Sequence, residues 1–129
     1  WNDGPVVGGC ISGGRKYFHV NANGDIEPCV FCHFATHNIR NSSLRDAIDS
    51  PLFRSIRCQL PSHENLLRPC VIIDKPEISR NAIREHEAYF THDGAEAVYE
   101  KLAKDIDQYA QAYGPIADVL WHKYFAKQT

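Results

Sequence analysis

The sequence contains no methionine and begins with Trp1. Because translation starts with methionine, we expect the chain to be a piece cut from a longer protein. No apolar run approaches the roughly 18 residues that a membrane-spanning helix needs, and no hydrophobic stretch resembles a signal peptide. These absences predict a protein that has no membrane partner and is located in the cytoplasm.

An excess of basic residues is also missing. The chain has 14 Lys and Arg against 16 Asp and Glu, which gives a formal net charge of -2. Binding to a phosphate backbone depends on clustered positive charge, so we expect no nucleic-acid partner. Hydrophobic residues make up 43% and charged residues 23% of the 129 residues, a composition and a length typical of one globular domain. We therefore predict a single domain over residues 1–129.

The cysteines and histidines stand out against this ordinary background. The sequence has 5 Cys and 7 His. An odd and unevenly spaced set of cysteines is a poor fit to a disulfide framework, so metal or redox chemistry becomes the better interpretation.

A tight hairpin is the clearest local prediction. Two short strand-like runs, residues 17–20 and 25–28, flank Asn23 and Gly24, a pair that favours the positive φ angles of a hairpin turn. With these two residues as the loop, Ala22 would face Asp25 and Cys29 would lie opposite Phe18.

Several helices are predicted after the hairpin, so the expected fold class is α+β. Residues 43–46 and 50–51 carry a capping pattern and a Ser-Pro start. From Lys75 the apolar spacing is helical through Phe90 and again over 98–113. Gly114 and Pro115 should break this second helix, and the apolar residues over 116–124 suggest a short last one. Cys58, at the end of a helix, should be a small buried core residue.

Four cysteines are predicted to converge. Cys29 and Cys32 form a C-x-x-C unit directly after the second strand. The glycine-rich loop could fold Cys10 back towards them, and Cys70 follows Pro69 in a stiffened loop. Four thiolates from three segments could hold either zinc or an iron–sulfur cluster.

The same residues carry a resemblance to a known family. Residues 9–15 (GCISGGR), the hairpin with its Asn-Gly-Asp turn, and residues 27–31 (EPCVF) resemble the C-terminal auxiliary cluster domain of radical S-adenosylmethionine enzymes, the SPASM/twitch type. Residues 37–40 (HNIR), 50–53 (SPLF) and 67–70 (LRPC) are similar to a branch of predicted Fe–S oxidoreductases. Residues 8–77 carry the specific part, and the helical part, 78–129, is a weaker match.

This resemblance implies an auxiliary iron–sulfur cluster, expected to be [4Fe–4S], bound by Cys10, Cys29 and Cys70. It also implies a preceding radical barrel in the same protein as the partner, where S-adenosylmethionine would bind. The C-x3-C-x2-C motif of that barrel is absent from this sequence, so the chain is not expected to be catalytic alone. The reaction and the substrate are left open.

The fourth ligand is left open among a few candidates: Cys32, Cys58, His33 or an open iron site. Three roles fit the cluster, namely electron relay, substrate binding and structural support. Two other functions use the same thiols. One is a small interaction module with zinc bound by Cys10, Cys29, Cys32 and Cys70, and the other is a dithiol redox protein that uses Cys29 and Cys32.

Overall fold

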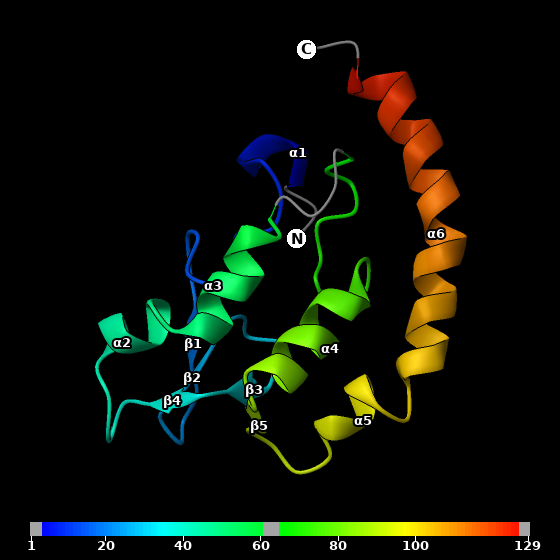
Figure 1. Ribbon diagram of the computed structural model, residues 1–129. Coiled ribbons are helices and arrows are strands. Elements are labelled where there is room, and N and C mark those ends of the chain that lie inside the picture. Colours follow the sequence, from blue (N-terminus) through cyan, green and yellow to red (C-terminus); the bar gives the residue numbers. More distant parts are fainter. Residues whose placement is uncertain (1–3, 61–64, 127–129) are drawn as a thin grey trace.

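The computed structural model describes residues 4–60 and 65–126 (Figure 1). Trp1, at which the sequence begins, lies outside these residues. The elements in chain order are α1 (Gly4–Val7), β1 (His19–Val20), β2 (Asp25–Glu27), β3 (Phe34–Ala35), β4 (His37–Asn38), α2 (Leu44–Ile48), α3 (Pro51–Cys58), α4 (Pro76–Glu85), β5 (Tyr89–Phe90), α5 (Glu96–Tyr99) and α6 (Ala103–Tyr124).

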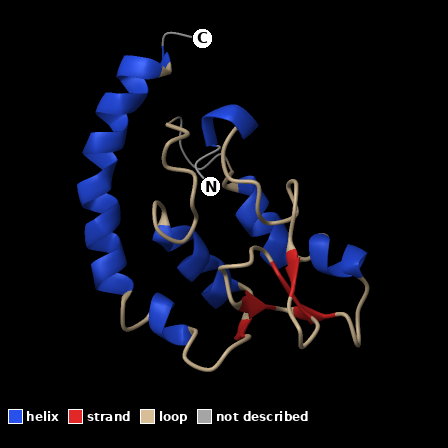
Figure 2. Cartoon of the chain, turned by 180° about the vertical axis from the view of Figure 1, so that it is seen from behind, coloured by secondary structure: helices blue, strands red, loops and turns tan. Residues whose placement is uncertain are grey.

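Two small antiparallel sheets and helices around them confirm the predicted α+β class. Strand β2 lies at the centre of the order β1-β2-β4, with Ile26 paired to Val20 on one side and to His37 on the other. Strands β3 and β5 form the second sheet, where Phe34 pairs with Phe90. Seen from behind, the strands lie together and the helices surround them (Figure 2).

The hairpin exists, but its predicted register is wrong by one residue. His19 pairs with Glu27 and Val20 pairs with Ile26, so the turn spans three residues between Asn21 and Asp25. The Asn21 carboxamide oxygen accepts hydrogen bonds from the backbone N–H groups of Asn23 and Asp25. This local side-chain bonding stabilises the longer turn.

The two predicted helix starts are confirmed. Ser43 caps α2 with a reciprocal capping box to Asp46, and Ser50 caps α3 by accepting a hydrogen bond from the N–H of Phe53. Each cap satisfies a backbone group that the first helical turn leaves unpaired. Helix α3 then buries Leu52, Phe53 and Ile56 on one face.

Helix α4 is shorter than the apolar spacing predicts. It ends at Glu85, and Tyr89 and Phe90 form β5 instead of a further helical turn. Phe90 stacks on Tyr99 at 5.7 Å between ring centroids, and its backbone pairs with Phe34. Sheet pairing with a buried partner strand outweighs the helical periodicity here, as tertiary contacts commonly do.

The predicted break at Gly114 and Pro115 is also wrong, because α6 continues through both residues to Tyr124. Gly114 is buried, and a Cβ placed on it would lie 3.2 Å from the Arg68 guanidinium carbon. One residue earlier, the Tyr113 hydroxyl donates to the carbonyl of Leu67 at 3.1 Å. These contacts hold the helix although a proline in its interior removes one backbone hydrogen bond.

The buried apolar residues form two adjoining clusters. The larger contains Cys32, Phe34, Leu52, Ile56, Val71, Ile72 and Ala82. The smaller contains Ile26, Ala47 and Phe53. Helix α3 contributes to both clusters, and the larger one includes a cysteine of the predicted site. The site is therefore part of the core and its geometry depends on core packing.

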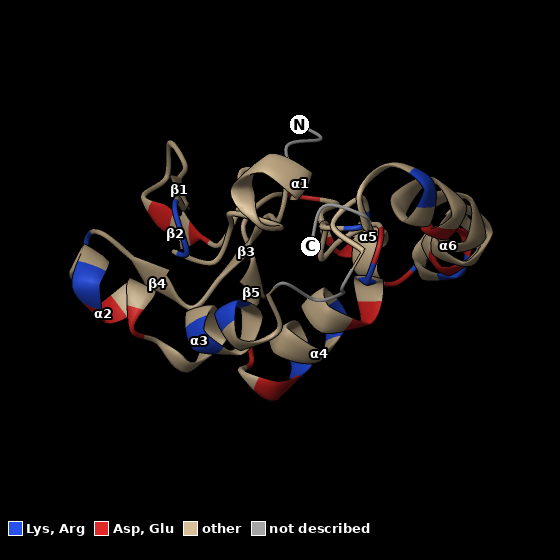
Figure 3. Cartoon of the chain, turned by 90° about the horizontal axis from the view of Figure 1, so that it is seen from above, with Lys and Arg blue, Asp and Glu red and all other residues tan. Residues whose placement is uncertain are grey.

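Charged residues of both signs are mixed along the outer helices, as Figure 3 shows for α4 and α6. The Arg80 guanidinium on α4 forms an ion pair with Asp107 on α6 at 2.6 Å. Within 4–60 and 65–126, no helix combines the length and the apolar character required to cross a membrane.

Gly13 joins three segments of the chain. Its N–H donates to the carbonyl of Pro28 at 2.9 Å, and its carbonyl accepts from the Arg57 guanidinium at 2.8 Å. Its φ is +66°, and a Cβ there would lie 2.9 Å from the Ile56 Cγ2 atom. Only glycine combines this backbone conformation with this close approach.

We predict that Gly13→Ala destabilises the protein more than Gly94→Ala. Both positions have positive φ, but no atom lies within 4 Å of a Cβ at Gly94. Gly94→Ala should lower the free energy of unfolding by about 1 kcal/mol through backbone strain alone. Gly13→Ala should add an overpacking cost of roughly 1–3 kcal/mol. Urea unfolding measures both; equal losses would contradict the close contact with Ile56.

Candidate metal centre

The loop that carries Cys10 is held by backbone-directed contacts. The Arg15 guanidinium donates to the carbonyls of Cys10 at 3.0 Å and Val7 at 2.8 Å. The Cys10 Sγ atom lies 3.0 Å from the hydroxyl of Ser12, whose side chain is buried. The loop lies at the hairpin end, as predicted, and Arg15, which was not among the predicted site residues, fixes it there.

Cys29 and Cys32 lie on a tight turn directly after β2. The N–H of Cys32 donates to the carbonyl of Cys29 at 3.0 Å, and the Tyr17 hydroxyl donates to the Cys29 Sγ at 2.8 Å. Cys32 is fully buried, and the Tyr99 hydroxyl donates to its carbonyl. The turn therefore holds one thiol in the core and one half-buried thiol beside a hydroxyl donor.

Cys70 reaches the same region from the loop before α4. Its N–H donates to the Asp74 carboxylate at 2.9 Å, and its Sγ accepts from the N–H of Ile72 at 3.4 Å. Cys70 and Cys29 both pack against the core cluster that contains Cys32. The Pro69-Cys70 loop thus delivers a thiol to the C-x-x-C turn, as the sequence suggests.

The pKa values of Cys29, Cys32 and Cys70 are shifted by burial and by the neighbouring thiols. A hydrogen bond from Cys32, with further help from Tyr17, lowers the pKa of Cys29 to about 6. The hydrogen bond to Cys29 and burial raise the pKa of Cys32, and the charges of Cys29, Cys70 and Cys10 raise it further. Burial raises the pKa of Cys70 to about 11, with a contribution from Cys10. Ionising several of these neighbouring, buried thiols together is therefore unfavourable unless a cation is bound.

Cys58 is not buried, so the prediction of a core cysteine is wrong. It is the last residue of α3 and is exposed. Two residues separate it from Ile56, a rotation of about 200° around a helix axis, so it lies opposite the buried face.

Two histidines near the site have other neighbours. His33, one of the candidates for the fourth ligand, has its Nδ1 atom 4.0 Å from a carboxylate oxygen of Glu27. The Nδ1 atom of His37 lies 2.9 Å from the hydroxyl of Thr36. The carboxylate of Glu27 was not among the candidates, because a single acidic residue in a strand gives no metal-binding pattern in sequence.

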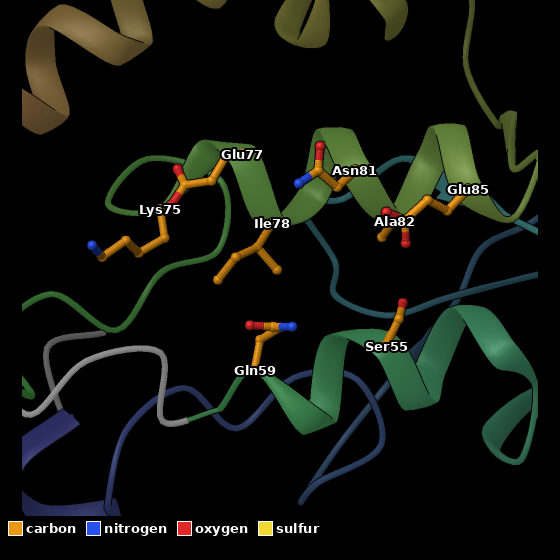
Figure 4. A pocket seen from close by; sticks show the side chains of 8 residues that line it. All are labelled: Ser55, Gln59, Lys75, Glu77, Ile78, Asn81, Ala82 and Glu85. Atoms are coloured by element: carbon orange, nitrogen blue, oxygen red, sulfur yellow. The ribbon is translucent and has the colours of Figure 1, made fainter.

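The surface between α3 and α4 is hollowed, but its lining is polar and helical (Figure 4). It is lined by Ser55, Gln59, Lys75, Glu77, Ile78, Asn81, Ala82 and Glu85. None of the predicted metal ligands is among these described residues, so this hollow is separate from the cysteine site.

We predict that Cys29 in the reduced, metal-free protein reacts with iodoacetamide at unusually low pH. The thiolate is the reacting form, so the rate at Cys29 should rise to half its maximum near pH 6, whereas Cys70 should need a pH near 11. Tyr17→Phe should move the Cys29 profile to higher pH, because it removes a donor to the thiolate. Mass spectrometry of the alkylated peptides measures each site; identical profiles for both cysteines would contradict the described hydrogen bonding.

Comparison with known proteins supports the metal chemistry of this region. Residues 10–71 match the family SPASM, described as an iron–sulfur cluster-binding domain. The matched segment includes all the predicted ligands, from Cys10 to Cys70. No curated protein and no solved structure matches the chain. The family match and the converging thiols together support a SPASM-type iron–sulfur cluster-binding domain over residues 10–71.

Proposed function

We propose that this chain is the auxiliary-cluster part of a radical S-adenosylmethionine oxidoreductase, with the cluster held by Cys10, Cys29, Cys32 and Cys70. The observation that carries the proposal is the placement of Cys29 and Cys70 against the core cluster that contains Cys32, with the Cys10 loop bonded to the hairpin end through Gly13, within a segment that matches a cluster-binding family. The donor chemistry fits, because thiolates are the ligands that iron–sulfur clusters prefer.

Cys32 is the best candidate for the fourth ligand. It is fully buried beside the other three thiols, whereas Cys58 is exposed and His33 faces a carboxylate. Four cysteines match the full ligand set of a [4Fe–4S] cluster. With every iron ligated by protein, substrate binding at an open iron is disfavoured.

Electron relay is the role that the surroundings support best. A bound cluster would supply one-electron redox chemistry, whose potential depends on hydrogen bonds to sulfur and on solvent exposure. The Tyr17 hydroxyl donates to Cys29, and the N–H of Ile72 donates to Cys70. The protein thus contributes burial and donors, the two features that tune such a site.

The partner that we propose is the radical barrel of the same protein. The exposed apolar side chains on α6 support this partner, because apolar surface of this kind is typical of docking faces. They are Tyr109, Ile116, Val119, Leu120 and Tyr124. Figure 1 shows α6 along one edge of the molecule, with neighbours on one side only.

A dithiol redox function has one observation in its favour, the low pKa of Cys29 beside Cys32. Two arguments favour cluster binding over it. Cys10 and Cys70 converge on the same pair, which a dithiol centre does not require, and the C-x-x-C turn is outside the βαβ setting of thioredoxin-like motifs.

We predict that Cys29→Ala abolishes cluster binding, whereas Cys58→Ala does not affect it. The protein would be purified without air and analysed for iron, sulfide and zinc, together with its absorption spectrum. The parent chain and Cys58→Ala should be brown, with near-equal iron and sulfide, and dithionite should bleach them.

The same measurement separates the alternatives. Cys29→Ala with undiminished iron would contradict the ligand set. Colourless parent protein with one zinc and no cluster after reconstitution would favour the interaction module, and protein without any metal would favour the dithiol function.

We further predict that Tyr17→Phe lowers the reduction potential of the bound cluster. The hydroxyl stabilises the more negative reduced form, and one hydrogen bond contributes about 1 kcal/mol. For a one-electron couple this corresponds to roughly 40 mV. A titration monitored by electron paramagnetic resonance measures the shift; an unchanged potential would show that Tyr17 does not donate to the ligating sulfur.

A further inference from the structure

A second group of metal-binding side chains lies beside the cysteine site and contains no cysteine. The ligand atoms of Glu27, His33 and His92 all lie within 4.8 Å of one another. The three residues come from the end of β2, the residue before β3 and the second residue after β5. Two imidazoles and one carboxylate are a donor set typical of zinc and of other divalent transition metals.

Strand pairing assembles this group from distant parts of the chain. Pairing of β3 with β5 places the N–H of Thr91 3.0 Å from the carbonyl of His33, so residues 91 and 92 adjoin residue 33. His33 has a φ of 51°, a conformation uncommon for a residue with a side chain. The rings of His33 and His92 then lie 4.7 Å apart, edge to face.

Glu27 is fully buried, and its carboxylate is oriented by several partners. One oxygen lies 2.7 Å from the Nδ1 atom of His19. The other accepts from the Thr91 hydroxyl and from the Asn21 amide at 3.3 Å. Within the part of the chain that the structure describes, no Lys or Arg pairs with it. A buried carboxylate is costly without a nearby cation, and such fixed partners are common around metal-bound carboxylates.

A ring nitrogen of His33 that lacks a hydrogen-bond partner among the described residues lies near this carboxylate. This Nδ1 atom is buried and lies 4.0 Å from a Glu27 oxygen. That separation is too long for a hydrogen bond. A tetrahedral ion bound at about 2.0–2.2 Å to both atoms would hold them about 3.4 Å apart, so binding would draw the two side chains slightly together.

We propose that Glu27, His33 and His92 bind one divalent transition-metal ion of the zinc type, in a site separate from the cluster ligands. His92 is exposed and, with Thr91, Asp93 and Glu96, lines an open surface pocket. This pocket gives an ion a route from solvent, and its two carboxylates favour a cation. Three protein ligands leave a coordination position for water or another small ligand.

The test uses the chain with its cluster loaded without air, so that the cluster thiolates are already occupied. Cobalt(II) would be added as a probe, because its visible bands report the ligands: nitrogen and oxygen donors give weak bands, whereas thiolates add intense charge-transfer absorption. We expect one cobalt per chain with weak bands only. Iron and sulfide measured in the same sample show separately whether the cluster is present.

The matched variants are His92→Ala and His122→Ala, both at exposed histidines. His92→Ala should weaken cobalt and zinc binding by more than roughly tenfold. Removing a residue that only hydrogen-bonds to a metal ligand already lowers metal affinity by about this factor. His122→Ala should bind like the parent chain. Zinc should raise the melting temperature of the parent chain and of His122→Ala, but not that of His92→Ala.

Three results would overturn the proposal. They are the absence of cobalt binding to cluster-loaded protein, equal binding by His92→Ala and the parent chain, and charge-transfer bands that reveal thiolate ligation. Glu27→Gln keeps the size of the side chain and removes its charge. If circular dichroism shows that this variant folds and it still binds cobalt as tightly as the parent chain, the carboxylate is not a ligand and the proposal fails.

Discussion

The contact on which the cysteine site depends is the one at Gly13. Its N–H binds the segment that leads into Cys29, and its carbonyl binds the Arg57 guanidinium, which also donates to the carbonyl of Ile48. A single residue with positive φ therefore ties the Cys10 loop to the hairpin and to α3. Any side chain there would meet Ile56, so the approach of Cys10 to the other thiols requires glycine.

Burial of polar groups is the common physical feature of the two donor sets. Cys32 and Glu27 are both fully buried. Three other thiols influence Cys32, and histidines and a threonine lie next to Glu27. The thiolate form of Cys32 and the carboxylate of Glu27 need a compensating cation in such positions. This requirement gives a physical reason for metal binding at thiolates and, in our proposal, at the neighbouring imidazoles and carboxylate.

Local chemistry in the sequence correctly predicted several elements. The caps at Ser43 and Ser50, the hairpin around Asn23 and Gly24, and the α+β class all follow from side chains that bond within a few residues. Local preference gave the wrong prediction where contacts with distant residues decide the structure. Helix α6 continues through Pro115, and helix α4 ends before β5 although the helical apolar spacing extends to Phe90. In both places contacts with residues far along the chain outweigh local preference.

For the site, the sequence by itself determined which thiols could bind metal, since a C-x-x-C turn, a glycine-rich loop and a Pro-Cys loop are visible in it. Only the tertiary structure decided that Cys32 is buried with them and that Cys58 faces solvent. The group of Glu27, His33 and His92 has no sequence pattern at all. Its members become neighbours through pairing of β3 with β5, and such long-range pairing depends on the whole fold.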